Sequence, residues 1–290
     1  MTTTKPTKDK IKALQIEYDR LRVGKESLLK LIDEAELSES VYNSNAIENS
    51  TLTLKETEKI LLDIEVSRNV SVREVFEAKN LARVSEYIRT KAVELELTGD
   101  TILLLHKMLI SNINDEYAGR FRKRGEYVRV GTHIAPAPEH VNGMIEATML
   151  QHVCDRENYF IDKIARFHLD FETIHPFCDG NGRIGRSIIN YQLTRLGFPN
   201  IIIRDKEKQL YYRCFREYRD SKKTRTMEQI LAHALLESLH KRLAYMSSQK
   251  IITLAEYAKQ SKRSINTLIN AAHRQTIAAF REKGIWKIGI

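Results

Sequence analysis

The sequence of 290 residues contains few cysteines, prolines and glycines, and it has no long hydrophobic run. Three cysteines, Cys154, Cys178 and Cys214, are scattered without metal-ligand spacing, which argues against a disulfide framework and fits a reducing cytosol. With five prolines and twelve glycines, long helices are seldom interrupted. No apolar segment has the length of a membrane span, and the first residues lack the apolar stretch of a signal peptide. We therefore expect a mainly α, cytoplasmic protein that does not enter a membrane.

The sequence is instead rich in charge and in helical patterns. Charged residues make up 29% of the chain and hydrophobic residues 42%, as is typical of globular proteins. Apolar residues recur with helical spacing over residues 8–34, and further helices are expected over 72–97 and 101–113. Thr53 and Glu56 form a capping-box pattern, which predicts that another helix begins there.

The most informative segment is residues 175–186, His-Pro-Phe-Cys-Asp-Gly-Asn-Gly-Arg-Ile-Gly-Arg. Its Gly-Asn-Gly turn opens a helix, where unpaired N–H groups and the helix dipole favour phosphate oxygens. Because Gly180 and Gly182 have no side chains, this backbone can approach a ligand closely. The turn therefore predicts a phosphate-binding site.

Charged groups of the same segment match the chemistry of a nucleoside triphosphate. Asp179 offers the hard oxygen ligands that Mg²⁺ prefers. Arg183 and Arg186 share one face of the predicted helix and can bind successive phosphates. His175 is the group that titrates near neutral pH, and it is the natural general base. The alternative is a polar loop with arginines on a solvated helix face.

This segment resembles the signature of the Fic (filamentation induced by cAMP) family, His-Pro-Phe-x-Asp/Glu-Gly-Asn-Gly-Arg-x-x-Arg, at all nine specified positions. The resemblance covers about residues 40–240. It implies a Fic-type helical bundle and a protein adenylyltransferase, which moves AMP from ATP to a Ser, Thr or Tyr hydroxyl of a protein substrate and releases pyrophosphate. The identity of the target protein stays open, and modification of the chain by itself is one alternative. The oligomeric state also stays open, with a homo-oligomer as one alternative.

The resemblance also implies a role for each residue of the segment. His175 would deprotonate the target hydroxyl, and Asp179 would carry Mg²⁺. Asn181, with the amides of Gly180 and Gly182, would hold the α- and β-phosphates of ATP. Arg183 would steady the β-phosphate and Arg186 would reach the γ-phosphate.

A second segment, residues 44–49 (Ser-Asn-Ala-Ile-Glu-Asn), resembles the inhibitory motif of the same family, Ser/Thr-x-x-x-Glu-Gly/Asn. Ser44, Glu48 and Asn49 fit its specified positions. The resemblance implies that Glu48 pairs with Arg186 and occupies the place of the γ-phosphate, so that the enzyme inhibits itself. The alternative is a solvated glutamate on an ordinary helix.

Residues 119–141 are predicted to form a β-hairpin, because apolar and polar residues alternate around a glycine. In Fic proteins this region is a flap that pairs with the target segment as an added strand. The flap residues are Val130, Gly131, Thr132, His133 and Ile134. The alternative is a purely structural hairpin.

Tyr211 and Tyr212 lie where Fic relatives have the aromatic pair of the adenine pocket. Arg219 stands where those relatives often have Asn or His, which puts a hydrogen bond to the adenine edge in doubt. The alternative for both tyrosines is a place in the hydrophobic core.

Residues 249–290 carry eight Lys and Arg against two Asp and Glu, a net charge of +6 out of +9 for the chain. A capping box at Thr253 predicts one helix, Ser264 is expected to cap a second, and two short apolar segments follow. This order resembles the winged helix-turn-helix of excisionase and MerR-like proteins. It implies DNA contacts by Arg263, Asn266, Thr267, Asn270 and Arg274. The alternative is a small basic packing unit.

We accordingly divide the chain into an N-terminal helical region (1–95), a catalytic core (96–245) and a winged helix-turn-helix-like module (249–290). Three further functions stay open. Glu48 could position a metal-bound water that removes AMP, or the chain could be a DNA-binding transcription regulator with a nucleotide-sensing core. The signature also permits transfer of UMP or phosphocholine.

Overall fold

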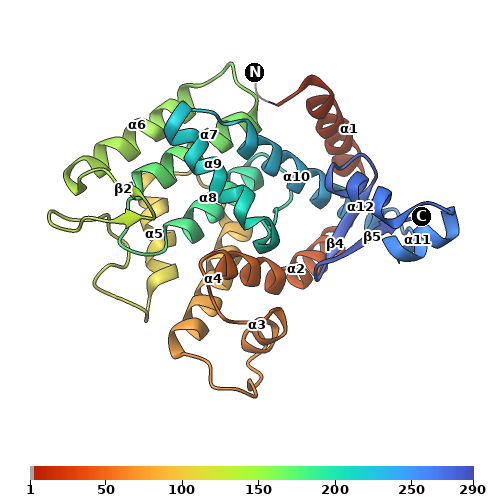
Figure 1. The fold of residues 1–290 in the computed structure, drawn as a ribbon, viewed down its shortest axis with the longest axis horizontal. Coiled ribbons are helices and arrows are strands. Elements are labelled where there is room, and N and C mark those ends of the chain that lie inside the picture. Colours follow the sequence, from red (N-terminus) through yellow and green to blue (C-terminus); the bar gives the residue numbers. More distant parts are fainter. Residues whose placement is uncertain (1–2) are drawn as a thin grey trace.

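The computed structural model describes residues 3–290 and is mainly helical, with two small antiparallel sheets, as expected (Figure 1). The longer helices are, in chain order, α1 (Lys5–Leu21), α2 (Glu26–Ile47), α3 (Leu54–Leu61), α4 (Val72–Lys91), α5 (Gly99–Ile110), α6 (Val141–Cys154), α7 (Phe160–Ile174), α8 (Asn181–Arg195), α9 (Lys208–Ser221), α10 (Arg225–Met246), α11 (Leu254–Ser261) and α12 (Ile265–His273). The strands and short 3-10 helices are β1 (Arg129–Val130), β2 (His133–Ile134), η1 (Pro138–His140), η2 (Asp205–Glu207), β3 (Ile251–Thr253), β4 (Ala279–Glu282) and β5 (Ile285–Gly289).

Local signals set several helix boundaries. The Thr53 hydroxyl accepts the Glu56 N–H at 3.3 Å, and the Glu56 carboxylate accepts the Thr53 N–H at 2.7 Å, so the predicted capping box is confirmed at α3. The same box opens α11 at Thr253. Ser264 occupies the N-cap position of α12, but its side chain makes no capping bond, so the predicted cap is wrong there. Gly24, with a φ of 74°, separates α1 from α2 within the expected helical stretch.

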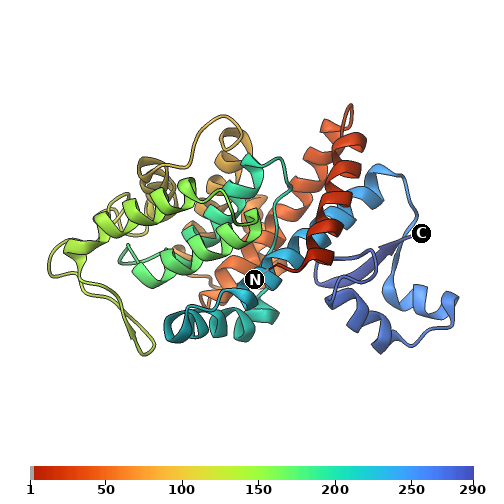
Figure 2. The ribbon, with the colours of Figure 1, turned by 90° about the horizontal axis from the view of Figure 1, so that it is seen from above.

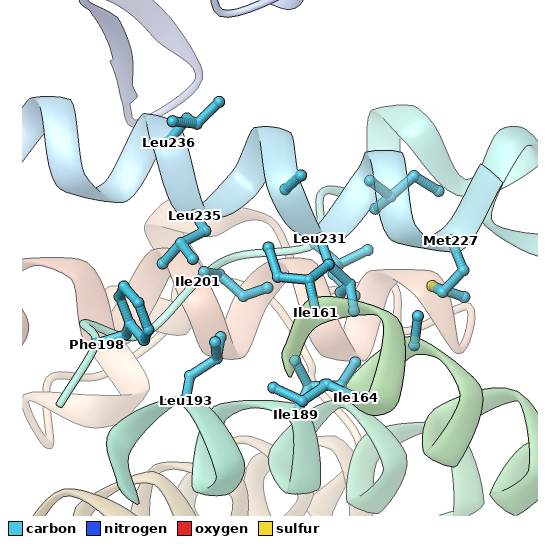
Figure 3. Close-up of a cluster of buried hydrophobic side chains, with 14 of the residues drawn as sticks. Ile161, Ile164, Ile189, Leu193, Phe198, Ile201, Met227, Leu231, Leu235 and Leu236 are labelled. Carbon is cyan, nitrogen blue, oxygen red and sulfur yellow. The ribbon is translucent and has the colours of Figure 1, made fainter. Parts of the chain in front are cut away.

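The central helices α7 and α8 are buried on both sides. On one side they pack against α10, and Figure 3 shows Leu231 and Leu235 of α10 pointing toward Ile189 and Leu193 of α8. On the other side they face α4, α5 and α6 through a second apolar cluster. Each fully buried Leu or Ile side chain contributes about 1.5–3 kcal/mol. The loop between α7 and α8 is therefore held by rigid neighbours.

The last residues form a C-terminal module (residues 249–290), in which α11 and α12 lie beside a sheet of order β3-β5-β4. Figure 2 shows this module at one end of the molecule and the β1–β2 hairpin at the other. The module has its own small apolar cluster around Leu254 and Leu268. Phe280 of β4 is buried, and β4 packs along α10.

Buried charges also attach the module to the helical body. The Glu39 carboxylate of α2 pairs with Arg204, and the same arginine pairs with Glu237 of α10 at 2.8 Å. Arg281 of β4 pairs with Glu237 at 2.7 Å. We call Glu39, Arg204, Glu237 and Arg281 the buried ionic cluster, since each side chain is at least 89% buried. Within residues 3–290, no helix combines the length and the hydrophobicity needed to cross a membrane.

Candidate active site

The segment 175–186 forms a tight loop between α7 and α8. His175 ends α7 in a left-handed conformation with a φ of 51°, and Gly180 precedes α8 with a φ of 83°. The Asn181 side chain accepts the Phe177 N–H at 2.9 Å and donates to the Phe177 carbonyl at 2.8 Å. Both polar atoms of the Asn181 side chain thus bind the loop backbone and shape the turn, and its contact with phosphate stays a prediction. Its backbone N–H still lies in the first turn of α8.

Arg122, which the sequence patterns did not single out, holds this loop to the hairpin. Its Nε donates to the His175 carbonyl at 2.9 Å, and its backbone N–H donates to the Pro176 carbonyl at 2.9 Å. The other guanidinium nitrogens donate to the carbonyls of Glu126 at 3.0 Å and Pro136 at 2.9 Å, at the base of the hairpin. Arg122 thus fixes the hairpin relative to His175.

A cavity of about 430 Å³ lies where the loop, the hairpin, α2 and α9 meet. It brings together most of the residues that the sequence singled out for the nucleotide and the target. Its lining includes Glu48, Val130, Gly131, Thr132, His133, Glu172, His175, Gly182, Arg186, Tyr211, Tyr212 and Arg219. Burial lowers the pKa of His175 to about 4, so its imidazole is neutral at pH 7 and can accept a proton.

Glu48 reaches into this cavity from the end of α2. Its Oε1 lies 2.9 Å from Nη2 of Arg186, in the pairing expected from the sequence. Arg186 also donates to the Ser44 hydroxyl at 3.0 Å and to the Ser44 carbonyl at 2.7 Å. Burial alone would lower the pKa of Arg186, but Tyr211 and Glu48 raise it, so the guanidinium stays charged. A side chain at Gly182 would collide with the Glu48 carboxylate, which therefore lies directly against the phosphate turn.

Asn49 follows Glu48 in a left-handed conformation with a φ of 69°. Glycine adopts this conformation without strain, and asparagine tolerates it better than most residues do. The motif's restriction to Gly or Asn after the glutamate therefore has a backbone reason. The Asn49 side chain accepts a hydrogen bond from Lys208 at 2.8 Å, which ties the end of α2 to α9.

Asp179 belongs to a closed ring of four charges. Arg73 of α4 pairs with Asp179 at 2.5 Å and with Glu77 at 3.0 Å. Arg183 pairs with Asp179 at 3.0 Å and with Glu77 at 3.1 Å. Burial alone would raise the pKa of Asp179, but Arg183 and Arg73 lower it, so the carboxylate is ionised at pH 7. The sequence patterns did not reveal Arg73 or Glu77, because both lie in an unremarkable stretch of α4.

This ring bears on the question of a metal. Among residues 3–290, no three His, Cys, Asp or Glu side chains form a group that could hold a metal ion by themselves. Mg²⁺ in nucleotide sites is commonly held by one or two carboxylates together with phosphate oxygens, and Asp179 suits that mode. Because Glu77 pairs with both Arg73 and Arg183, these arginines keep a carboxylate partner when Asp179 turns toward a cation.

The two tyrosines of α9 have different environments. Tyr211 is 1% exposed, and its hydroxyl lies 2.8 Å from Nε2 of His168 and 3.5 Å from Nη1 of Arg186. Tyr211 thus supports Arg186 and also lines the cavity, so its place in an adenine pocket stays a prediction. Tyr212 is half-buried and donates to the Ile47 carbonyl at 2.7 Å. Tyr212 and Arg219 line the cavity.

The predicted flap is present as a hairpin, although each strand is only two residues long. Val130 pairs with His133, and Arg129 pairs with Ile134. A ring nitrogen of His133 lies 2.9 Å from the Thr173 carbonyl of α7, which holds the hairpin over the cavity. The outer side chains are exposed, with Ile134 at 71%.

The residues predicted to contact DNA lie on α12 and immediately before and after it, in the C-terminal module. All five are exposed, and none of them lines the cavity: Arg263, Asn266, Thr267, Asn270 and Arg274. The module therefore presents a polar and basic surface that is separate from the active-site cavity.

Comparison with known proteins identifies the relatives of this chain. Residues 96–193 match the Fic/DOC family. The chain is 31% identical over 208 residues to the protein adenylyltransferase Fic of Nematostella vectensis, a match that covers 70% of this chain and 48% of that protein. A relative of the same name in Drosophila willistoni is 32% identical over 180 residues, which cover 59% of this chain and 35% of that protein. The chain thus spans half or less of the length of these relatives.

The fold is shared with solved structures. A Fic domain containing signaling protein from Bacteroides thetaiotaomicron superposes with a TM-score of 0.74 at 25% identity, over 83% of this chain and 98% of that chain. A Fic family protein from Desulfovibrio desulfuricans superposes with a TM-score of 0.61 at 18% identity, over 100% of this chain and 97% of that chain. The second likeness concerns the fold alone.

Proposed function

We propose that this chain, whose residues 96–193 form a domain of the Fic/DOC family, transfers AMP from ATP to a hydroxyl group of a protein. The observation that carries the proposal is the cavity that His175, Gly182 of the phosphate turn and Arg186 line together with residues of the β1–β2 hairpin. The names of the relatives agree with this activity.

The chain's own groups account for the steps of the transfer. Neutral His175 takes the proton of the target hydroxyl, whose oxygen then attacks the α-phosphorus of ATP. The bond from that phosphorus to the bridging oxygen of pyrophosphate breaks, and pyrophosphate leaves. The N–H groups of the turn and the guanidinium of Arg183 stabilise charge on the phosphates, which is the main requirement of phosphoryl-type transfer. Mg²⁺ bound to Asp179 and phosphate oxygens would neutralise further charge.

We also infer that Glu48 inhibits the transfer in cis. Its carboxylate is bound to Arg186 and lies against Gly182, so a γ-phosphate cannot use the same guanidinium. Arg186 keeps its two hydrogen bonds to Ser44 when Glu48 leaves, and it is therefore ready to bind phosphate. Because the Glu48 side chain is 36% exposed, its release costs less than the release of a fully buried partner.

The test is Glu48→Gly, examined by ATP titration calorimetry and by mass spectrometry after incubation with ATP and Mg²⁺. We expect the variant to bind ATP about tenfold more tightly or better and to gain the mass of AMP on itself or on an added protein. The gain should vanish when His175→Ala is added. Glu34→Gly, an exposed position on the same helix, is the matched control and should behave as the unmodified chain. A variant that binds ATP no more tightly, or a gain that survives without His175, would reject the proposal.

A second candidate function concerns the C-terminal module. Its charge of +6 and the exposed polar face of α12 favour contact with the DNA backbone, in the manner of a winged helix-turn-helix. The full chain should bind a DNA duplex with an affinity that falls steeply with salt, measured by fluorescence anisotropy. Arg263→Ala together with Arg274→Ala should weaken binding and reduce the salt dependence. Equal binding by the double variant would contradict this function.

A further inference from the structure

One acidic group in the cavity has no place in the chemistry described so far. Glu172 lies on the last turn of α7, three residues before His175, and its Oε2 is 3.8 Å from Nδ1 of His175. Its side chain is 10% exposed, and it forms part of the cavity wall. In the part of the chain that the structure describes, Oε1 of Glu172 is buried without a hydrogen-bond partner, and Nδ1 of His175 is buried with no side-chain partner, while the ring also contacts the Glu172 backbone. The carboxyl group thus faces the imidazole at a distance from which a small movement makes contact.

The neighbouring helix is shaped to admit this carboxyl group. A Cβ atom at Gly185 of α8 would lie 2.5 Å from Oε1 of Glu172 and 2.9 Å from Cε1 of His168. Position 185 is one of the three free positions in the signature, so the phosphate turn does not itself demand a glycine there. A glycine at this point lets α7 and α8 approach closely enough for Glu172 to sit beside the ring.

We propose that Glu172 is the positioning residue of His175: it orients the imidazole and stabilises the positive charge that the ring acquires when it takes the proton of the target hydroxyl. The inference rests on the proposed AMP transfer and adds a partner to its general base. The Glu172 carboxylate neither gains nor loses a proton or a covalent bond during the reaction. The hydroxyl proton moves to His175, the oxygen bonds to the α-phosphorus, and pyrophosphate leaves with the electrons of the broken bond.

Several charged or titratable groups face this pair. Glu48 of α2 and Arg186 of α8 act on Glu172, and Arg122, Glu48 and His133 act on His175. His168 and Tyr211 close the inner side, where they bind each other. The like charge of Glu48 opposes ionisation of Glu172, and Arg186 favours it.

The inhibited state therefore keeps Glu172 neutral. Burial first, and the charge of Glu48 second, raise the pKa of Glu172 to about 8, against the opposing effect of Arg186. In a Glu48→Gly chain without nucleotide the second cause is absent, so the pKa of Glu172 should fall there; with ATP bound, the γ-phosphate again places negative charge beside Arg186. The rate of transfer should then rise with pH as Glu172 ionises, and it should be constant at higher pH. This rise is separate from the one set by His175, whose pKa is about 4.

The experiment uses the full chain in the Glu48→Gly background and compares it with Glu172→Gln and Glu172→Asp on that background. Initial rates of AMP transfer are measured from pH 5 to pH 9 at saturating ATP. We expect Glu172→Gln to lower kcat by about tenfold to a hundredfold, as loss of support to a general base does, with the KM for ATP unchanged. Its profile should lack the rise that ionisation of Glu172 produces in the parent. Glu172→Asp should keep the rise at an intermediate rate. Asp170→Asn, on the same helix and outside the cavity, is the matched control.

The outcomes separate this inference from the function on which it rests. If the Glu48→Gly parent itself transfers no AMP, the proposed function fails. If the parent transfers AMP and Glu172→Gln has the same kcat and the same profile, the role of Glu172 is refuted and the function stands. A Glu172→Gln chain that binds ATP poorly, or that unfolds earlier than the Asp170→Asn chain, would show a merely structural role and would also overturn the inference.

Discussion

The buried ionic cluster makes a quantitative prediction about how the C-terminal module is attached. Glu39 accepts hydrogen bonds from the Arg204 guanidinium, from the Lys283 N–H at 2.9 Å and from the Gly284 N–H at 3.1 Å. The last two donors belong to the turn between β4 and β5. In Glu39→Ala, Arg204 therefore keeps only one carboxylate partner, Glu237. The backbone N–H groups of Lys283 and Gly284 lose the acceptor that Glu39 provides.

The cost follows from burial. The side chains of Glu39 and Arg204 are 5% and 7% exposed, so water cannot replace the lost contacts. Removing one partner of such a pair costs about 3–5 kcal/mol. At about 2–4 °C per kcal/mol for a chain of this order of size, the midpoint of thermal unfolding should fall by roughly 6–20 °C. Glu39→Gln keeps an acceptor oxygen and should lose less.

Thermal unfolding followed by circular dichroism measures the loss, and amide hydrogen exchange locates it. Exchange at Lys283 and Gly284 should accelerate in Glu39→Ala. Glu34→Ala is the matched control, since Glu34 is an exposed residue of the same helix and its ion pair with Lys30 is long, at 3.7 Å. If Glu39→Ala and Glu34→Ala unfold within about 1 °C of each other, burial of the cluster does not stabilise the fold, and the reasoning is wrong.

Three further predictions concern Glu237 of the buried ionic cluster, the ion pair of Asp179 with Arg73, and Gly180 of the phosphate turn. Burial alone would raise the pKa of Glu237, but Arg204 and Arg281 lower it, so its stabilising effect is present above about pH 4.3 and is lost as the pH falls through the lowered pKa. Glu237→Gln should therefore unfold at a lower temperature than the unmodified chain at pH 7, and the difference should shrink as the pH falls through that pKa. In Arg73→Ala, Asp179 loses an exposed ion-pair partner that competes with a cation for its carboxylate. Calorimetry with ADP present should therefore show an affinity for divalent cations that is raised by about two- to fivefold. A lower affinity would contradict the assignment of Asp179 as the metal-binding residue. Gly180→Ala forces a side chain into a φ of 83°, 3.1 Å from Ile110, and should cost about 1–2 kcal/mol in urea unfolding, whereas Gly143→Ala, on an open helix face, should be neutral or stabilising.

The sequence alone was sufficient where the determining interactions lie within a few residues. The capping boxes of α3 and α11 depend on groups three positions apart, and the structure has both. The turn at Gly180 and, in the C-terminal module, two helices followed by two strands depend equally on local backbone preferences and apolar spacing. The sequence did not predict β3, whose partner β5 lies more than 30 residues further along the chain. The resemblance of residues 175–186 likewise depends on contiguous residues.

Tertiary packing alone decided which distant groups meet. Glu48 and Arg186 are 138 residues apart, and only the packing of α2 on α8 brings them within 2.9 Å. Arg122, Arg73 and Glu172 belong to no recognisable sequence pattern. The partners of Arg122 and Arg73 lie in other elements, and Glu172 meets His175 only because of the way in which the chain leaves α7. The near-complete burial of Tyr211 was unpredictable for the same reason: a residue's place in a pattern does not determine how much of its surface neighbouring helices cover, and burial decides which chemistry is open to it.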